Sequence, residues 1–132
     1  MNYSSEMLLV NKYYKIIDIY GEGSNVVYRI VFLPDCDVYR GHFPGNPVCP
    51  GVCNIQTIKE CTMMLTGKKL TISTIKQCRL TAVASPMICQ EIDVRISISP
   101  IDKGFTVTAT MTDAERTYME YKGDMVIDST QH

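Results

Sequence analysis

The chain has 132 residues, 45% of them hydrophobic, and 13 basic side chains against 14 acidic ones. This length suits one domain with a real core and is too short for two. The balanced charge provides no overall field that would favour nucleic acid or an anionic membrane. No apolar stretch approaches the length of a transmembrane helix. We therefore expect one soluble domain over residues 1–132, with neither nucleic acid nor a membrane as partner.

The cysteines predict a reducing compartment rather than a disulfide framework. The chain opens without the basic region and long apolar run of a secretory signal, so we expect reduced thiols and a cytoplasmic protein. Cys49 and Cys53 are four residues apart and Cys61 follows, but no CxxC pair or second histidine stands at zinc-ligand spacing. We predict small buried hydrophobic side chains and no metal site.

Two strands are expected before residue 34. Residues 7–19 are rich in Tyr, Ile and Val, residues 21–25 read GEGSN, and a second β-rich run covers residues 26–33. From Pro34 to Gly51 the prolines and glycines exclude both a helix and a central strand, so a stiff irregular connection is predicted. Connections of this kind often carry functional residues.

One long helix is expected over residues 52–65, followed by strands. Pro50 stands near its first turn and Gly67 follows its end, which is the usual placement of proline and glycine around a helix. Apolar residues on and off its main stripe predict a largely buried helix. Strands are then expected over 70–83, 92–98 (before Pro100), 105–111 and 116–127, and the last residues are expected to fray. This order predicts an α+β architecture in which an antiparallel sheet packs on one helix.

The segment 41–52 reads GHFPGNPVCPGV. It resembles the GHFPGxPxxPG motif of the hotdog-fold 3-hydroxyacyl-[acyl carrier protein] dehydratases. The resemblance also covers residues 38–40, as an aromatic approach to the motif, and 75–86, as the strand that follows. It implies the hotdog fold, in which an antiparallel sheet wraps around one long central helix.

His42 is the first candidate catalytic residue. It is the only histidine outside the tail, and imidazole is the side chain best suited to move a proton near neutral pH. Pro50 has no N–H, so the first free donors at the helix start belong to Gly51 and Val52, where the helix dipole is positive. By resemblance, the Gly51 amide polarises the thioester carbonyl while His42 removes the α-proton. The motif also implies Phe43, Pro50 and Val52 as substrate-binding residues.

The helix departs from the family pattern at two positions. The dehydratases carry a Glu or Asp fourteen residues after the histidine to protonate the departing hydroxyl, and Gln56 stands there in this chain. An amide cannot donate a proton in that way. One turn later, where the family commonly has a glutamine, this chain has Glu60, which lies on the same helix face. Glu60 therefore either supplies the missing carboxyl or is a partly exposed surface carboxylate beside Lys59 or Lys68.

The resemblance leaves three functions open. The first is dehydration of a 3-hydroxyacyl thioester on acyl carrier protein to a trans-2-enoyl thioester, by a homodimer or a dimer-based oligomer in which His42 faces Gln56 and Glu60 of the other chain. The second is thioester hydrolysis, with Gln56 positioning a water. The third is a non-catalytic acyl-binding subunit that pairs with an active dehydratase.

No cofactor is predicted, because the chain lacks a dinucleotide fingerprint and a phosphate loop. Five cations could form a basic rim for the acidic carrier protein or its phosphopantetheine phosphate, although solvated surface charge is the better explanation of any one of them. They are Arg40, Lys68, Lys69, Lys76 and Arg79.

Overall fold

The computed structural model describes residues 7–39, 49–87 and 91–128. Within them lie six strands, one long helix and a short 3-10 helix. In chain order they are β1 (Tyr14–Glu22), β2 (Asn25–Phe32), η2 (Asp37–Tyr39), α1 (Gly51–Thr66), β3 (Leu70–Leu80), β4 (Glu91–Ile101), β5 (Gly104–Thr112) and β6 (Thr117–Ile127).

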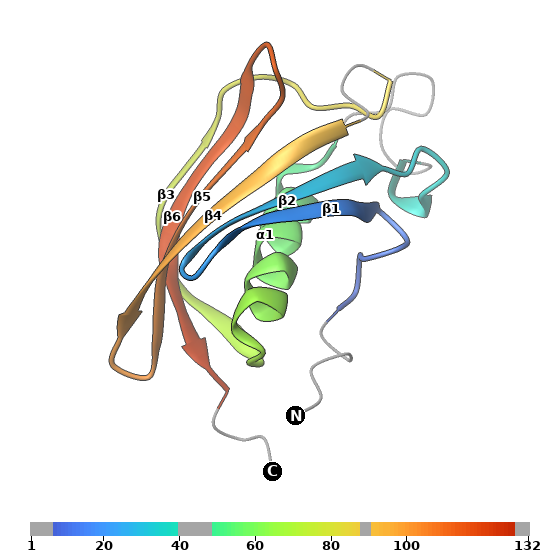
Figure 1. The fold of residues 1–132 in the computed structure, drawn as a ribbon. Helices are drawn as coiled ribbons and strands as arrows, with labels where there is room; N and C mark the ends of the chain where they lie inside the picture. The colour runs from blue at the N-terminus through green and yellow to red at the C-terminus, as the bar shows by residue number, and fades with distance from the viewer. Residues whose placement is uncertain (1–6, 40–48, 88–90, 129–132) are drawn as a thin grey trace.

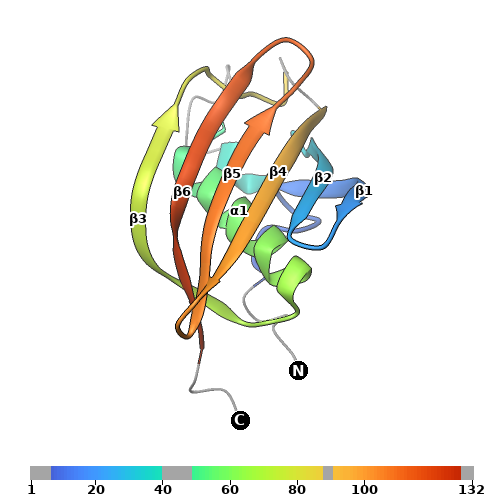
Figure 2. The ribbon, with the colours of Figure 1, turned by 60° about the vertical axis from the view of Figure 1, so that its left-hand side comes forward.

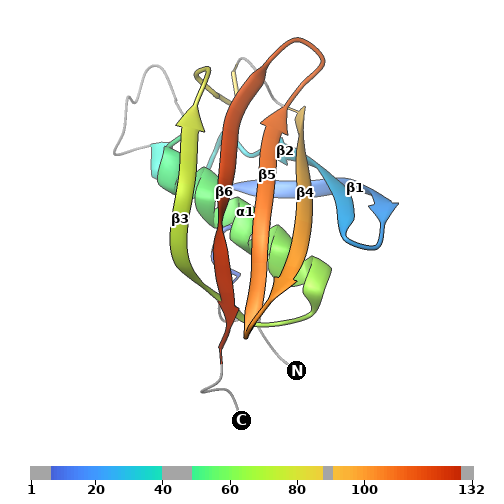
Figure 3. The ribbon, with the colours of Figure 1, turned by 90° about the vertical axis from the view of Figure 1, so that its left-hand side faces the viewer.

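The strands form one curved sheet in the order β1-β2-β4-β5-β6-β3, and every neighbouring pair is antiparallel. The sheet curves around α1, which lies across its inner face (Figures 1 and 2). The predicted α+β architecture is confirmed. Figure 3 looks onto the outer face of the sheet, with β3 along one edge and the helix behind.

Alternation along the central strands builds the core. Val94 and Ile96 on β4 and Val107, Ala109 and Met111 on β5 are buried, whereas the residues that alternate with them are more exposed. One side chain in two therefore faces the helix, as expected for a sheet covered on one face. On the helix, the buried residue Ile58 meets this inner layer.

Both predicted helix boundaries are confirmed within one residue. Pro50 occupies the N-cap in an extended conformation, and Gly67 ends the helix with φ 68°, its N–H bonded to the Met63 carbonyl at 2.8 Å. Glycine adopts this left-handed geometry at little cost. The helix is largely buried as expected, except at Val52 in its first turn, which is 73% exposed.

The N-terminal strand begins later than predicted. Instead of extending from residue 7, the chain turns at residues 9–13, where the Lys12 and Tyr13 amides bond the Leu9 carbonyl at 3.0 and 2.7 Å. Strand β1 then runs from Tyr14 to Glu22. The composition of the segment could not predict this turn, because the Leu9 and Val10 amides bond Glu60 on α1, some fifty residues away.

Other strand boundaries shift by smaller amounts. Strand β3 ends at Leu80 rather than Val83, β4 continues through Pro100 to Ile101, and β6 begins at Thr117. Pro100 is tolerated because it lies at the end of its strand, opposite Phe105.

The cysteines are only partly the buried side chains that we expected. Cys49 and Cys61 are buried, but Cys78 is exposed on the edge strand β3, which contradicts the prediction for that residue. All five described cysteines are free thiols.

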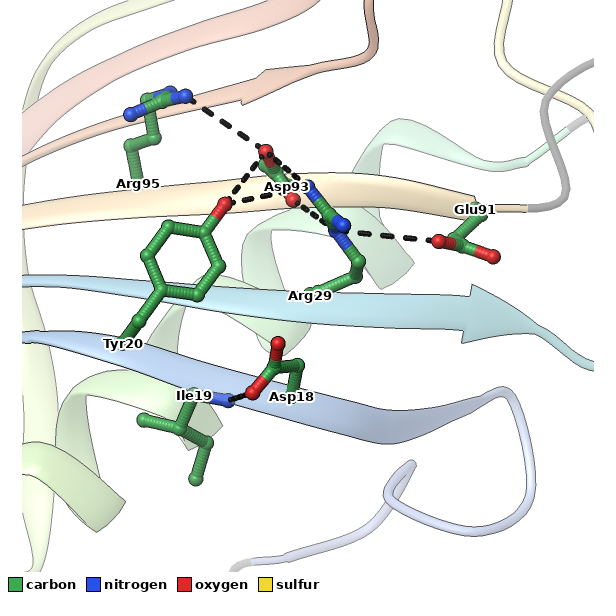
Figure 4. A network of polar contacts seen from close by, with 7 residues as sticks. All are labelled: Asp18, Ile19, Tyr20, Arg29, Glu91, Asp93 and Arg95. Carbon is green, nitrogen blue, oxygen red and sulfur yellow. Dashed lines mark hydrogen bonds and ion pairs between the residues drawn. The ribbon is translucent and has the colours of Figure 1, made fainter.

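A polar network ties β1, β2 and β4 together on the outer face (Figure 4). Asp93 accepts hydrogen bonds from Arg29 Nε at 2.9 Å and from the Tyr20 hydroxyl at 3.0 Å. The hydrogen bond from the Arg29 guanidinium is the main reason why the pKa of the Asp93 carboxyl lies below its usual range. The contacts join side chains from three neighbouring strands, so we assign the network a structural role.

Tyr121 on β6 carries a buried hydroxyl with no hydrogen-bond partner in the part of the chain that the structure describes. Burial raises its pKa to about 12. A buried polar group without a partner costs free energy, so we expect Tyr121→Phe to raise the free energy of unfolding by about 1 kcal/mol in urea denaturation. Tyr14→Phe is the control, because its hydroxyl is hydrogen-bonded and its loss should destabilise the fold. Destabilisation by Tyr121→Phe would contradict the prediction.

Candidate active site

The start of α1 combines close packing with a row of backbone donors. Gly51 is the first helical residue, and a Cβ built on it would lie 3.3 Å from Cδ1 of Leu80, at the end of β3. The Cys53 and Asn54 amides both reach the Pro50 carbonyl at 3.1 Å. The preceding Gly51 and Val52 amides have no intrahelical acceptor, and the helix dipole makes this end positive. The geometry suits a carbonyl oxygen that gains negative charge.

His42 and Phe43 lie outside the described residues, so their predicted roles stay predictions. The residues on either side of the segment 40–48 are described and meet each other. The Tyr39 hydroxyl lies 3.4 Å from the Cys49 sulfur, and the Cys49 amide bonds the Ala84 carbonyl at 2.8 Å. The chain therefore enters and leaves the motif segment beside the start of α1.

Glu60 is fully buried, which rules out the partly exposed carboxylate that the sequence left open. Each of its carboxylate oxygens accepts two hydrogen bonds. Oε2 binds the Leu9 amide and Gln56 Nε2, both at 2.9 Å, and Oε1 binds the Val10 amide at 3.0 Å and the Tyr14 hydroxyl at 2.9 Å. A carboxylate offers about four acceptor positions, so these donors occupy all of them.

Two further ionisable groups beside Glu60, the Tyr14 hydroxyl and the Cys61 thiol, are also buried. Burial is the main cause that raises the pKa of the Tyr14 hydroxyl and that of the Cys61 thiol, and the Glu60 charge raises both further. Both groups therefore stay neutral, and the Tyr14 hydroxyl remains a donor to Glu60. The carboxylate holds the N-terminal turn against the helix.

Gln56 lies one turn before Glu60 and is half-buried. The hydrogen bond from its Nε2 to Glu60 fixes the orientation of its amide. The structure thus brings Gln56 and Glu60, the two positions at which the helix departs from the family pattern, into direct contact, as their spacing predicts. Their roles in catalysis are not decided by this contact.

A pocket of about 320 Å³ opens beside the first turn of α1. Its lining comes from the segment before the helix, the helix itself, the end of β3 with the chain that follows, and β6. The residues are Cys49, Asn54, Leu80, Thr81, Ala82, Val83, Ala84 and Tyr118. Of the motif residues predicted to bind substrate, Val52 is exposed and Pro50 is half-buried, and neither lines this pocket.

Sequence reasoning missed two residues of this region. The sequence assigns no role to Asn54, and it predicts Tyr13 within a strand. The Tyr13 hydroxyl donates to Asn54 Oδ1 at 2.8 Å, and both side chains are buried. The one signal for Asn54 in the sequence is its position between the apolar residues Cys53 and Ile55, one turn into the helix.

The predicted basic rim is largely neutralised. Lys69, Lys76 and Arg79 pair with Asp128, Asp124 and Glu120, at 3.6, 3.3 and 3.7 Å. Arg40 lies outside the described residues. The described ranges contain no group of three or more His, Cys, Asp or Glu side chains that could hold a metal ion. No helix within them is long and apolar enough to cross a membrane.

The curved antiparallel sheet around one long helix, with a glycine at the helix start, is the hotdog fold. The family model of the ApeI-like dehydratases, described as ApeI dehydratase, matches residues 18–120. The chain belongs to this family.

Two solved structures and a curated relative are similar to the chain. A chain of the dehydratase heterocomplex ApeI:P from Xenorhabdus doucetiae has 18% identity and a TM-score of 0.70, over 85% of this chain and 96% of that one. An uncharacterized protein from Erwinia carotovora subsp. atroseptica has 17% identity and a TM-score of 0.56, over 85% and 92%. The 3-hydroxyacyl-[acyl-carrier-protein] dehydratase FabZ of Caulobacter vibrioides is 44% identical over 36 residues, which are 27% of this chain and 23% of the relative.

Proposed function

We propose that this chain is a subunit of a dehydratase that removes water from 3-hydroxyacyl thioesters of acyl carrier protein in the cytoplasm. The motif around His42, the helix start at Gly51 and the family membership support this substrate class. In the proposed reaction, the Gly51 amide binds the thioester oxygen and His42 takes the α-proton. The bond from C3 to the hydroxyl then breaks, the hydroxyl leaves as water with a proton from an acid, and the double bond forms between C2 and C3.

The acid is the critical part of this proposal. Gln56 cannot donate a proton of this kind. Glu60 already accepts four hydrogen bonds, two of them from backbone amides, so a proton on either oxygen would displace a donor. This saturation of Glu60 is the observation that carries the proposal. We infer that the acid that works with His42 comes from the helix of a different protein, a second hotdog chain that pairs with this one.

This arrangement follows from the way hotdog dehydratases assemble, with the histidine of one subunit facing the helix carboxyl of the other. In a homodimer of this chain, His42 would face Gln56 and the saturated Glu60. In a heterodimer, His42 would face the intact carboxyl of the partner. The Xenorhabdus doucetiae structure that shares this fold is itself named a dehydratase heterocomplex.

The exposed apolar surface around the pocket supports the proposal that a second chain covers it. Val52, Leu80, Val83 and Met87 are each more than half exposed, and they belong to the helix start, the end of β3 and the segment after it. Strand β3 is also an edge of the sheet, with a row of backbone groups open to pairing. Large apolar side chains gathered beside an open edge are typical of an interface.

The assay that tests this proposal follows enoyl thioester formation from a 3-hydroxyacyl-carrier-protein. The chain would be assayed alone, together with a hotdog chain that keeps the carboxyl at the position of Gln56, and with that partner alone. A neighbouring gene is the first place to seek the partner. We expect a heteromeric complex on size-exclusion chromatography and enoyl formation by the mixture well above the sum of the two separate chains.

Two other outcomes would replace the proposal. Full dehydration by the isolated chain, abolished by Glu60→Gln, would establish a homodimer in which Glu60 acts as a relocated acid, directly or through a water. Release of free thiol and acid in place of the enoyl thioester would establish a thioesterase, with Gln56 positioning the attacking water.

A further inference from the structure

The buried amide of Asn54 has a fixed orientation. Asn54 is 3% exposed, and its Oδ1 accepts the hydrogen bond of the Tyr13 hydroxyl at 2.8 Å. The Nδ2 group therefore lies on the opposite branch of the amide. In the described part of the chain, Nδ2 has no hydrogen-bond acceptor. Among the described residues, the Tyr121 hydroxyl is the one fully buried side-chain polar atom without a partner, so Asn54 Nδ2 still reaches solvent.

The pocket beside the helix start is the open space that Asn54 adjoins. Asn54 lines it, together with mainly apolar side chains such as Leu80, Ala82 and Val83. The Thr81 hydroxyl, which also belongs to the lining, already donates to the Thr117 carbonyl at 2.6 Å, and the Tyr118 hydroxyl donates to Asp113. The pocket thus has the build of a ligand site, with apolar walls and a polar group that can fix the orientation of the ligand.

The place of Asn54 on the helix says which part of a substrate it would meet. It lies three residues after Gly51, which corresponds to about 4.5 Å along the helix axis. If Gly51 holds the thioester carbonyl, as proposed above, a chain running inward along the helix covers this distance in roughly three to four carbon–carbon bonds. An oxygen near C5 of the acyl chain would then lie at the depth of Asn54.

We propose that Asn54 determines acyl specificity: the pocket receives the acyl chain, and Asn54 Nδ2 donates a hydrogen bond to a carbonyl or hydroxyl oxygen near C5. This inference rests on the proposed function for the position of the thioester. A fully saturated chain in the same pocket would cover Nδ2 and leave it without an acceptor. Sites with a buried donor reject such analogues, and we expect discrimination of roughly tenfold or more.

Binding of two matched ligands tests this inference without any turnover. Both are pantetheine derivatives in which an amide replaces the thioester, one carrying a hexanoyl chain and the other a 5-oxohexanoyl chain. Because the pantetheine arm has carbonyl oxygens of its own, pantetheine alone serves as the reference. Calorimetry gives each Kd, and the side-chain NH₂ signals of Asn54 are followed by ¹⁵N NMR, with the chain alone and in complex with its partner.

We expect the 5-oxo ligand to bind about tenfold more tightly and to shift the Asn54 NH₂ signals, which the hexanoyl ligand leaves in place. Asn54→Asp should abolish the difference, because it keeps an acceptor for Tyr13 but loses the donor. Asn54→Leu is the second variant and should do the same. Thr62→Val is the matched control on α1, since the Thr62 hydroxyl bonds the Ile58 carbonyl of its own helix.

Three results would overturn the inference: equal affinity for the two chains, a preference that persists in Asn54→Asp, or binding of neither ligand above pantetheine alone. The inference and the proposed function fail separately. Dehydration without a chain preference would remove only the role of Asn54. A chain preference in a protein that forms no enoyl product would remove only the proposed reaction.

Discussion

Replacement of Glu60 by alanine is expected to lower the free energy of unfolding by about 4 kcal/mol. The substitution leaves the Leu9 and Val10 amides and the Tyr14 hydroxyl without their acceptor in a buried environment. It also frees the N-terminal turn from the helix. Urea denaturation followed by circular dichroism would measure the loss.

The control for this prediction is Glu115→Ala. The Glu115 side chain is 80% exposed and lies 3.9 Å from Arg116, so its removal should change the stability by less than about 0.5 kcal/mol. If Glu60→Ala unfolds within about 1 kcal/mol of the unsubstituted chain, the carboxylate is not the anchor that its hydrogen bonds indicate. If the unsubstituted chain dehydrates on its own, a stable but inactive Glu60→Ala would instead favour Glu60 as the relocated acid.

The second large effect is expected at His42. In the complex with its partner, His42→Ala should reduce enoyl thioester formation by about 10²- to 10⁴-fold, because the α-proton loses its acceptor. The rate is measured with a saturating 3-hydroxyacyl-carrier-protein, and His132→Ala in the tail is the matched control. An unchanged rate in the His42→Ala complex would show that the reaction proceeds entirely at the partner's histidine.

Gln56→Glu tests whether the missing carboxyl is what keeps the isolated chain from forming the enoyl thioester. This substitution restores a carboxyl at the position where the dehydratase motif has its acid, so the isolated chain should gain enoyl formation that His42→Ala then removes. A Gln56→Glu chain that remains inert on its own, although folded and able to join its partner, would mean that the isolated chain lacks more than an acid.

Local chemistry in the sequence determined the helix and most of the strands. Pro50 and Gly67 bound α1 as predicted, because a missing N–H and a tolerated positive φ act within one turn of the chain. Alternation along residues 92–98 and 105–111 predicted β4 and β5, because a sheet with one covered face buries one residue in two.

The tertiary structure alone decided the state of the polar groups on the helix. By sequence, Glu60 was equally an acid or a surface carboxylate, and its burial depends on donors from Leu9, Val10 and Tyr14, about fifty residues away. The sheet order, with β3 brought to the edge beside β6, also depends on long-range packing.

Asn54 illustrates the same division. The sequence places an amide one turn into the helix, but its orientation comes from the Tyr13 hydroxyl and its pocket from the chain around Leu80. Residue types and their spacing therefore determined which groups the helix carries. Only the packing of distant segments decided which of these groups are saturated and which face open space, because hydrogen-bond partners and burial are properties of the folded chain.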